Sequence, residues 1–243
     1  MSSIEVSSIV FACVFGGALG GMALRGILPE HHRTGESKEL VRSAMALIST
    51  LSALVLGLLV ASAKSSYDAQ KDELTSLTSG MVLLDRVLAM YGPEAKNARE
   101  LLREVVASAR DQIWHGAPPV KRADTLFESI NRLSPKNDEQ PTLKAQASSL
   151  VIDLAKTRYL MLEQKGSSVS TPLLVVVVFW LTINFISFGL FAQRNATVGI
   201  ALFVCALSVA GAIFLILEMD RPFEGLIRIS DAPLHQVLTQ LDH

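Results

Sequence analysis

Four ionisable side chains stand where the chain leaves its last apolar run, in the stretch LEMDRPFEG: Glu218, Asp220, Arg221 and Glu224. A carboxylate at the C-terminal end of a helix opposes the helix dipole, so Glu218 and Asp220 need a compensating cation there. The interpretation that we favour is a structural ion pair with Arg221. The alternative is a Ca²⁺ site, in which the carboxylates act together with carbonyl oxygens that Pro222 leaves without helical partners.

A second group of candidate residues lies in and around the apolar run from Ala44 to Ala63. On a helical count, small or weakly polar side chains share one face of this run, with a cation beyond each end. This small-residue stripe consists of Arg42, Ala46, Ser49, Thr50, Ala53, Gly57, Ala61 and Lys64. Repeated around an oligomer axis, the stripe would line a narrow pore with positive mouths that favour anions. The alternative, which the residues alone favour, is interfacial anchoring by the cations and helix packing by the small side chains.

A third group is formed by the glycines of the stretch GGALGG, Gly16, Gly17, Gly20 and Gly21. They form two pairs with a spacing of four residues. In a membrane, such pairs let two helix backbones approach closely. The pattern leaves open whether the partner helix belongs to the same subunit or to a neighbouring one.

The remaining polar groups offer little chemistry. Asn184 lies inside an apolar run and needs a partner from a neighbouring helix or a water-filled cavity. The adjacent histidines of EHHR, residues 30–33, are interpreted as a solvated loop, because no third metal ligand stands near them. Arrays for nucleophilic catalysis, Gly-rich phosphate loops and HExxH motifs do not occur in the sequence, so we expect no enzyme. Apart from the possible Ca²⁺, we expect no cofactor.

Four apolar runs can position these groups, because each is long enough to cross a bilayer core. The runs are Val6 to Leu24, Ala44 to Ala63, Leu173 to Ala192 and Val198 to Leu217. None has an ionisable side chain in its interior, and 50 % of the 243 residues are hydrophobic. The leader MSSIE lacks Lys and Arg, so we interpret the first run as a retained span rather than a signal peptide. Cys13 and Cys205 lie inside these runs and are expected to be buried as small apolar side chains.

The chain is predicted to be an all-α membrane protein with four transmembrane helices in two hairpins. The predicted segments are a first hairpin over residues 1–64, a helical soluble domain over 65–168, a second hairpin over 169–219 and a polar tail over 220–243. Between the hairpins, apolar residues alternate three and four apart at Leu74, Leu77, Met81, Leu84, Leu88 and Tyr91. This seam is typical of a helix in a bundle or coiled coil. Because no breaker precedes the stretch YGPE, the second span is expected to continue into this helix.

Four stretches resemble a bacterial membrane-protein family of unknown function that is described as bestrophin-like. They are ALVLGLLVASAKSSYD, LLDRVLAMYGPEA, FWLTINFISFGLFAQRNAT and LEMDRPFEGLIRIS, and the resemblance extends from the first span to about Leu234. The two-plus-two layout of the spans, and the similarity of DRPFEG to the Asn-Pro-Phe-Gly segment after the bestrophin spans, extend the resemblance to bestrophins. Two features depart from bestrophins: the second span has no aromatic neck residue, and the calcium-binding acidic run is reduced to Glu218, Asp220 and Glu224.

Bestrophins are pentameric anion channels whose second span lines the pore. The resemblance therefore implies a homo-oligomer, suspected to be a pentamer, that passes an ion such as chloride past the small-residue stripe. It also implies a location in the bacterial inner membrane, with the helical domain and both termini in the cytoplasm. The distribution of Lys and Arg does not decide this orientation. The alternative function is a non-conducting scaffold or stress sensor whose helical domain binds a partner protein. With a net charge of −1 and no basic groove, nucleic-acid binding is not expected.

Overall fold

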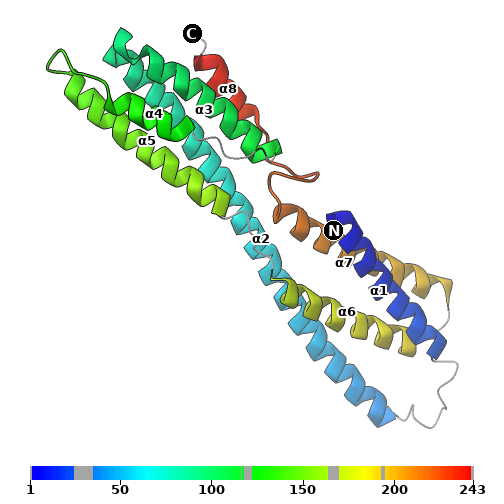
Figure 1. Cartoon of the computed structure of the whole chain (residues 1–243). Coiled ribbons are helices and arrows are strands. Elements are labelled where there is room, and N and C mark those ends of the chain that lie inside the picture. Colours follow the sequence, from blue (N-terminus) through cyan, green and yellow to red (C-terminus); the bar gives the residue numbers. More distant parts are fainter. Residues whose placement is uncertain are drawn as a thin grey trace. The chain divides into compact units, whose positions relative to one another are not determined.

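Figure 1 shows the computed structural model of the chain, which describes residues 2–24, 35–115, 117, 122–163, 170–192 and 195–241. Over these ranges the chain forms helices and no strand, which confirms the predicted all-α class. The helices are α1 (Ser3–Leu24), α2 (Gly35–Tyr91), the short 3₁₀ helix η2 (Pro93–Ala95), α3 (Lys96–His115), α4 (Arg122–Asn131), α5 (Gln140–Glu163), α6 (Thr171–Phe191), α7 (Ala196–Met219) and α8 (Ala232–Leu241).

Four helices of the described part are long and apolar enough to cross a membrane: α1, α2, α6 and α7. They contain the four predicted apolar runs, apart from Ala192, which immediately follows α6. As predicted, α2 continues without a break beyond its apolar part to Tyr91. It ends at Gly92, whose positive φ of 114° is strained for any residue with a side chain, and Pro93 then begins η2. The arrangement of the spans as two hairpins stays a prediction.

Contacts divide the chain into two compact units. The first unit contains Met1–Tyr67 and Ser167–Arg221, and the second contains Asp68–Gly166 and Pro222–His243. Helix α8 of the second unit was not predicted from the sequence, in which the tail was described only as polar. Leu234, Val237 and Leu241 are buried there, and their spacing of three and four residues was the overlooked sign of a helix.

The first unit is held together by α1, which packs along α6 and α7. Its core includes Val14, Ala18, Phe185 and Ile213. Beside it, the rings of Phe11, Phe15 and Phe203 form a cluster with centroid distances of 5.4–5.6 Å. The α2 helix joins this unit through a second apolar cluster, in which Leu59 and Ala63 meet Val177 of α6 and Ile216 of α7.

Glycines bring the backbones of α1 and α6 into direct contact. A Cβ atom built on Gly21 would lie 2.1 Å from the carbonyl oxygen of Ile186, and one built on Gly189 would lie 2.0 Å from that of Ala18. A Cβ on Gly17 would also touch α6, whereas Gly16 and Gly20 have no atom within 4 Å of such a position. Gly17 and Gly21 therefore pack within the subunit, and Gly16 and Gly20 stay exposed.

The second unit is built around the C-terminal part of α2. The six predicted seam residues, Leu74, Leu77, Met81, Leu84, Leu88 and Tyr91, are each at most 2 % exposed. Arg99 of α3 donates two hydrogen bonds to the carboxylate of Asp85 of α2, at 2.7 and 3.0 Å. This bond raises the pKa of the Arg99 guanidinium. The seam is thus covered by other parts of its own unit.

Tyr91 gives a stability prediction, because its buried hydroxyl has no hydrogen-bond partner among the described residues. Burial raises the pKa of this hydroxyl. Tyr91→Phe removes the unsatisfied oxygen and keeps the ring, so we expect the stability to stay equal or to rise by up to about 1 kcal/mol. Thermal unfolding of the purified protein measures the change. A clear loss of stability would mean that the hydroxyl has a partner, such as an ordered water molecule.

Candidate functional site

The small-residue stripe of α2 lies on the surface of the first unit. Every member except Ser49 is exposed: Arg42, Ala46, Thr50, Ala53, Gly57, Ala61 and Lys64. A Cβ atom built on Gly57 would meet no atom within 4 Å. The hydroxyl of Thr50 donates to the carbonyl oxygen of Ala46 at 2.9 Å, so it is satisfied within the helix and leaves its own oxygen available as an acceptor. Apart from Ser49, the side chains of the stripe are not buried by any neighbour within the described part of the chain.

The apolar part of α2 is the least covered of the four candidate spans. Only 11 % of its most apolar window is buried, against 22 or 28 % for the other three. On a count of about 100° per residue, three lines of side chains run along it. One line, with Ser52, Leu59 and Ala63, is buried. A second consists of Leu47, Leu51, Leu54 and Leu58, which are 44–64 % exposed. The small-residue stripe is the third.

Ser49 lies at the edge of the stripe and points toward α6. Its hydroxyl donates a hydrogen bond of 3.0 Å to Oδ1 of Asn184, which is 2 % exposed. The amide nitrogen of Asn184 donates to the carbonyl oxygen of Trp180 at 3.1 Å. The sequence correctly predicted that Asn184 finds a partner on a neighbouring helix. This polar contact joins α2 to α6 beside the stripe.

A cavity of about 580 Å³ borders the Arg42 end of the stripe. Arg42, Ala46 and Ser49 line it from α2, and Phe188 and Leu202 are among the residues that line it from α6 and α7. The cavity is mainly apolar, and Arg42 is the cation at its edge. The Arg42 end of the stripe therefore borders a cavity among α2, α6 and α7 of the first unit.

The ionisable residues after the last span are divided between the two units. Glu218, Asp220 and Arg221 belong to the first unit and Glu224 to the second. Glu218 is 3 % exposed, whereas Glu224 is exposed. The helix end keeps some of its carbonyl groups satisfied, because the amide of Asp220 donates to Ile216 at 3.1 Å and that of Arg221 to Glu218 at 3.2 Å.

The expected metal chemistry can be compared only with part of the chain. Over the described residues, no group of three or more His, Cys, Asp or Glu side chains is placed to hold a metal ion. The EHHR motif, residues 30–33, lies outside the described residues, as does Arg194 in the connection between the last two spans. The expectation of buried cysteines is wrong, since Cys13 and Cys205 are both exposed on their helices, where lipid or another subunit can cover them.

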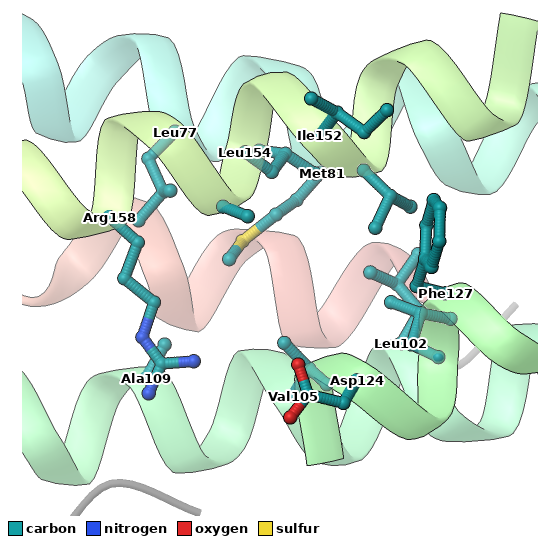
Figure 2. A pocket seen from close by; sticks show the side chains of 13 residues that line it. Leu77, Met81, Leu102, Val105, Ala109, Asp124, Phe127, Ile152, Leu154 and Arg158 are labelled. Atoms are coloured by element: carbon teal, nitrogen blue, oxygen red, sulfur yellow. The ribbon is translucent and has the colours of Figure 1, made fainter. Parts of the chain in front are cut away.

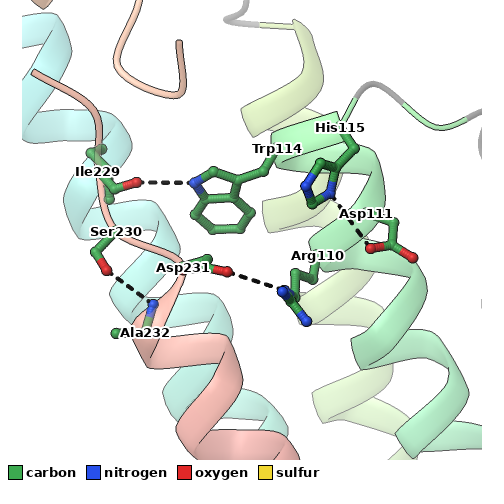
Figure 3. Close-up of polar contacts among 8 residues, drawn as sticks. All are labelled: Arg110, Asp111, Trp114, His115, Ile229, Ser230, Asp231 and Ala232. Atoms are coloured by element: carbon green, nitrogen blue, oxygen red, sulfur yellow. Dashed lines mark hydrogen bonds and ion pairs between the residues drawn. The ribbon is translucent and has the colours of Figure 1, made fainter. Parts of the chain in front are cut away.

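A set of contacts that was not predicted from the sequence holds the tail against α3 in the second unit (Figure 3). The indole nitrogen of Trp114 donates to the carbonyl oxygen of Ile229 at 2.9 Å, and its ring meets that of Phe223 edge-on at 5.5 Å. Arg110, one turn earlier on α3, donates to the carboxylate of Asp231 at 3.1 Å. The four-residue spacing of Arg110 and Trp114 was the available sign. We call these contacts the tail clamp.

The four apolar helices, with a helical second unit, define a multi-span membrane protein of the all-α class. The sequence matches the model of the Bestrophin-like domain over residues 12–234. The chain therefore belongs to the Bestrophin-like family, which confirms the resemblance found in its sequence.

Comparison with solved structures agrees at the level of the fold. The chain is similar to the crystal structure of a bacterial bestrophin homolog from Klebsiella pneumoniae that carries one mutation, with a TM-score of 0.72. The alignment covers 96 % of this chain and 97 % of that chain at 11 % sequence identity. At so low an identity the likeness shows a bestrophin-like fold and carries no residue-level function. No curated protein matches the chain.

Proposed function

We propose that this protein is a bestrophin-like ion channel, formed by a homo-oligomer in which α2 lines the pore. The observation that carries the proposal is the small-residue stripe, which is exposed along its length between Arg42 and Lys64. Leucines on the neighbouring line of α2 suit lipid, whereas two cations and an exposed Thr50 hydroxyl suit water. In a ring of subunits, the stripe faces a water-filled pore on the axis, and the leucines face lipid or the adjacent subunit.

The proposed permeant ion is an anion such as chloride. Each subunit contributes Arg42 at one end of the stripe and Lys64 at the other, so an oligomer has a positive ring at each mouth. Lys64 is held near the pore wall by the ring of Tyr67, whose centroid lies 5.7 Å from the ammonium nitrogen. Between the rings no carboxylate interrupts the stripe. Pentameric assembly follows from the bestrophin resemblance.

The proposed location is the bacterial inner membrane, with the second unit and both termini in the cytoplasm. The interpretation that we favour for Glu218 and Asp220 stays a structural ion pair with Arg221, and Ca²⁺ binding with calcium gating is the alternative. Flux measured with and without Ca²⁺ on either side of the membrane tests the gating. Protease accessibility of the second unit in inside-out and right-side-out vesicles tests the orientation.

Chloride flux from liposomes that contain the purified protein tests conduction directly. Thr50→Leu and Gly57→Leu each place a bulky apolar group on the stripe. An added barrier of about 1.4 kcal/mol lowers the rate tenfold, so we expect flux to fall roughly tenfold or more. Gly211→Leu on α7 is the matched control, since Gly211, like Gly57, is an exposed helical glycine without a neighbour within 4 Å.

The proposal fails if the wild-type oligomer is intact and passes no ion under any condition. It also fails if Gly57→Leu and Gly211→Leu reduce flux equally, because the stripe would then have no special role. The molecular mass of the oligomer, measured by native mass spectrometry, tests the pentamer separately. The scaffold alternative gains nothing from the seam of Leu74 to Tyr91, which its own unit already covers.

A further inference from the structure

The second unit contains a mainly apolar pocket of about 240 Å³ that the channel proposal does not use. It lies among α2, α3, α4 and α5, and Figure 2 shows its lining from close by. Met81, Val105 and Leu154 are among its apolar walls. Figure 2 shows Arg158 at one end and Phe127 with Leu102 at the other. The volume exceeds that of a cavity of about 150 Å³ that admits benzene, so a small organic ligand fits.

Arg158 places a positive charge at one end of the pocket. Arg158 is half-buried, and its guanidinium donates a short hydrogen bond to the neutral side-chain oxygen of Gln112. Among the described residues, no carboxylate lies within ion-pair distance of it. Burial lowers the pKa of Arg158, yet a guanidinium stays protonated in proteins. A partly desolvated cation whose only hydrogen-bond partner among the described residues is neutral is costly, and a bound anion would reduce that cost.

The dimensions of the pocket limit the length of the anion. The lining extends from Leu102 to Ala109 along α3 and from Val151 to Arg158 along α5. Seven residues of helix rise about 10 Å, so the pocket has room for an extended chain of about that length behind the charged end. The second polar group, Asp124 on α4, is exposed, and Figure 2 shows its carboxylate between the Arg158 end and the Phe127 end of the pocket. The negative charge of Asp124 repels an anionic head group, so the head group is expected at the Arg158 end.

We propose that this pocket binds a medium-chain aliphatic carboxylate, with its head group on Arg158 and its chain toward Phe127. A carboxylate suits the planar fork of a guanidinium, which can donate two parallel hydrogen bonds to it. A single cation matches a single negative charge, whereas a phosphate dianion would leave one charge uncompensated. The apolar walls would hold the alkyl chain, and a longer chain would extend beyond the pocket into water.

Octanoate is the probe, and the full-length protein in lipid nanodiscs is the sample. The affinity of the protein for octanoate is measured by isothermal titration calorimetry. Octanol is the uncharged analogue, and butyrate is the short-chain analogue. Wild-type protein should bind octanoate at least tenfold more tightly than either analogue. Arg158→Gln should lower the affinity for octanoate on the order of tenfold, because it removes a hydrogen-bonding charge. The affinity for octanol should stay unchanged.

Three further variants make the test decisive. Lys156→Gln removes an exposed cation of α5 outside the pocket and should leave octanoate binding unchanged, whereas attraction to general surface charge would be weakened by it. Empty nanodiscs measure adsorption to the lipid. Ala155→Phe fills the pocket from its rim and should abolish binding of octanoate and octanol alike. Arg158→Lys keeps the charge and should retain part of the affinity. Thermal unfolding of each variant confirms that it is folded.

Two results would overturn the proposal. One is the absence of octanoate binding to folded wild-type protein. The other is equal weakening by Arg158→Gln and Lys156→Gln, which would assign the binding to general surface charge. Because neither readout involves ion flux, this outcome is separate from that of the channel proposal.

Discussion

Gly21→Ala is expected to destabilise the first unit by about 3 kcal/mol. The added methyl group would lie 2.1 Å from the carbonyl oxygen of Ile186 and 3.0 Å from the amide nitrogen of Leu190. Both are backbone atoms of α6 and cannot turn away as a flexible side chain does. The helices must therefore separate, which opens the core around Ala18 and Phe185. Unfolding in mixed micelles with an increasing fraction of denaturing detergent measures the decrease in the free energy of unfolding.

The neighbouring glycine provides the control. Gly20→Ala adds the same methyl group one residue earlier, where no atom lies within 4 Å. Alanine also has the higher helix propensity, so this variant should be as stable as the wild type or slightly more stable. Gly189→Ala, on the α6 side of the contact, should match Gly21→Ala. Equal stability of the variants at positions 20 and 21 would contradict the close approach of α1 and α6.

This comparison shows where sequence reasoning ends. The same spacing of four residues relates two pairs of glycines, Gly16 with Gly20 and Gly17 with Gly21. The pattern therefore predicts a close helix contact but does not tell which pair makes it. The choice depends on the partner, since Gly189 of α6 lets the backbone of Ala18 approach closely. Gly189 stands between Phe188 and Leu190 without a second small residue four positions away, which is why the pattern did not reveal it.

The helices themselves were largely predictable because their causes are local. Long apolar runs exclude any structure but a spanning helix, and the Gly92–Pro93 pair ends α2 where the sequence indicated. The missed helix, α8, is short, and its three buried apolar residues were outweighed by the polar composition of the tail. Average composition hides an amphipathic helix of ten residues, whereas the spacing of Leu234, Val237 and Leu241 preserves it.

The candidate site was predictable only in part. The exposed small-residue stripe follows from side-chain size and a helical count, both of which the sequence contains. The polar contact between α2 and α6 is made instead by Ser49, which bonds Asn184, 135 residues away in the chain. The tail clamp and the pocket beside Arg158 likewise bring together side chains from separate helices. Such pairings depend on tertiary packing, which no local pattern records.

The tail clamp leads to the second large effect, which is release of the tail by Trp114→Ala. This substitution removes the edge-on contact with Phe223 and leaves the carbonyl oxygen of buried Ile229 without its indole donor. Since Trp114 is only partly buried, we expect a cost of about 2 kcal/mol, less than for a fully buried tryptophan. That cost raises the population of the open tail roughly thirtyfold, because each 1.4 kcal/mol is a factor of ten.

Limited trypsin digestion detects this opening at Arg228, which is exposed on the tail just before Ile229. When opening and closing are fast relative to cleavage, the rate follows the open population, so Trp114→Ala should speed cleavage there by a similar factor. Cleavage after Lys136, in another loop of the same unit, should not change. His115→Ala is the neighbouring control, because its contact with Asp111 spans 3.6 Å between largely exposed groups and contributes little. Unchanged cleavage after Arg228 in Trp114→Ala would mean that α8, through its packing on α3, holds the tail without the clamp.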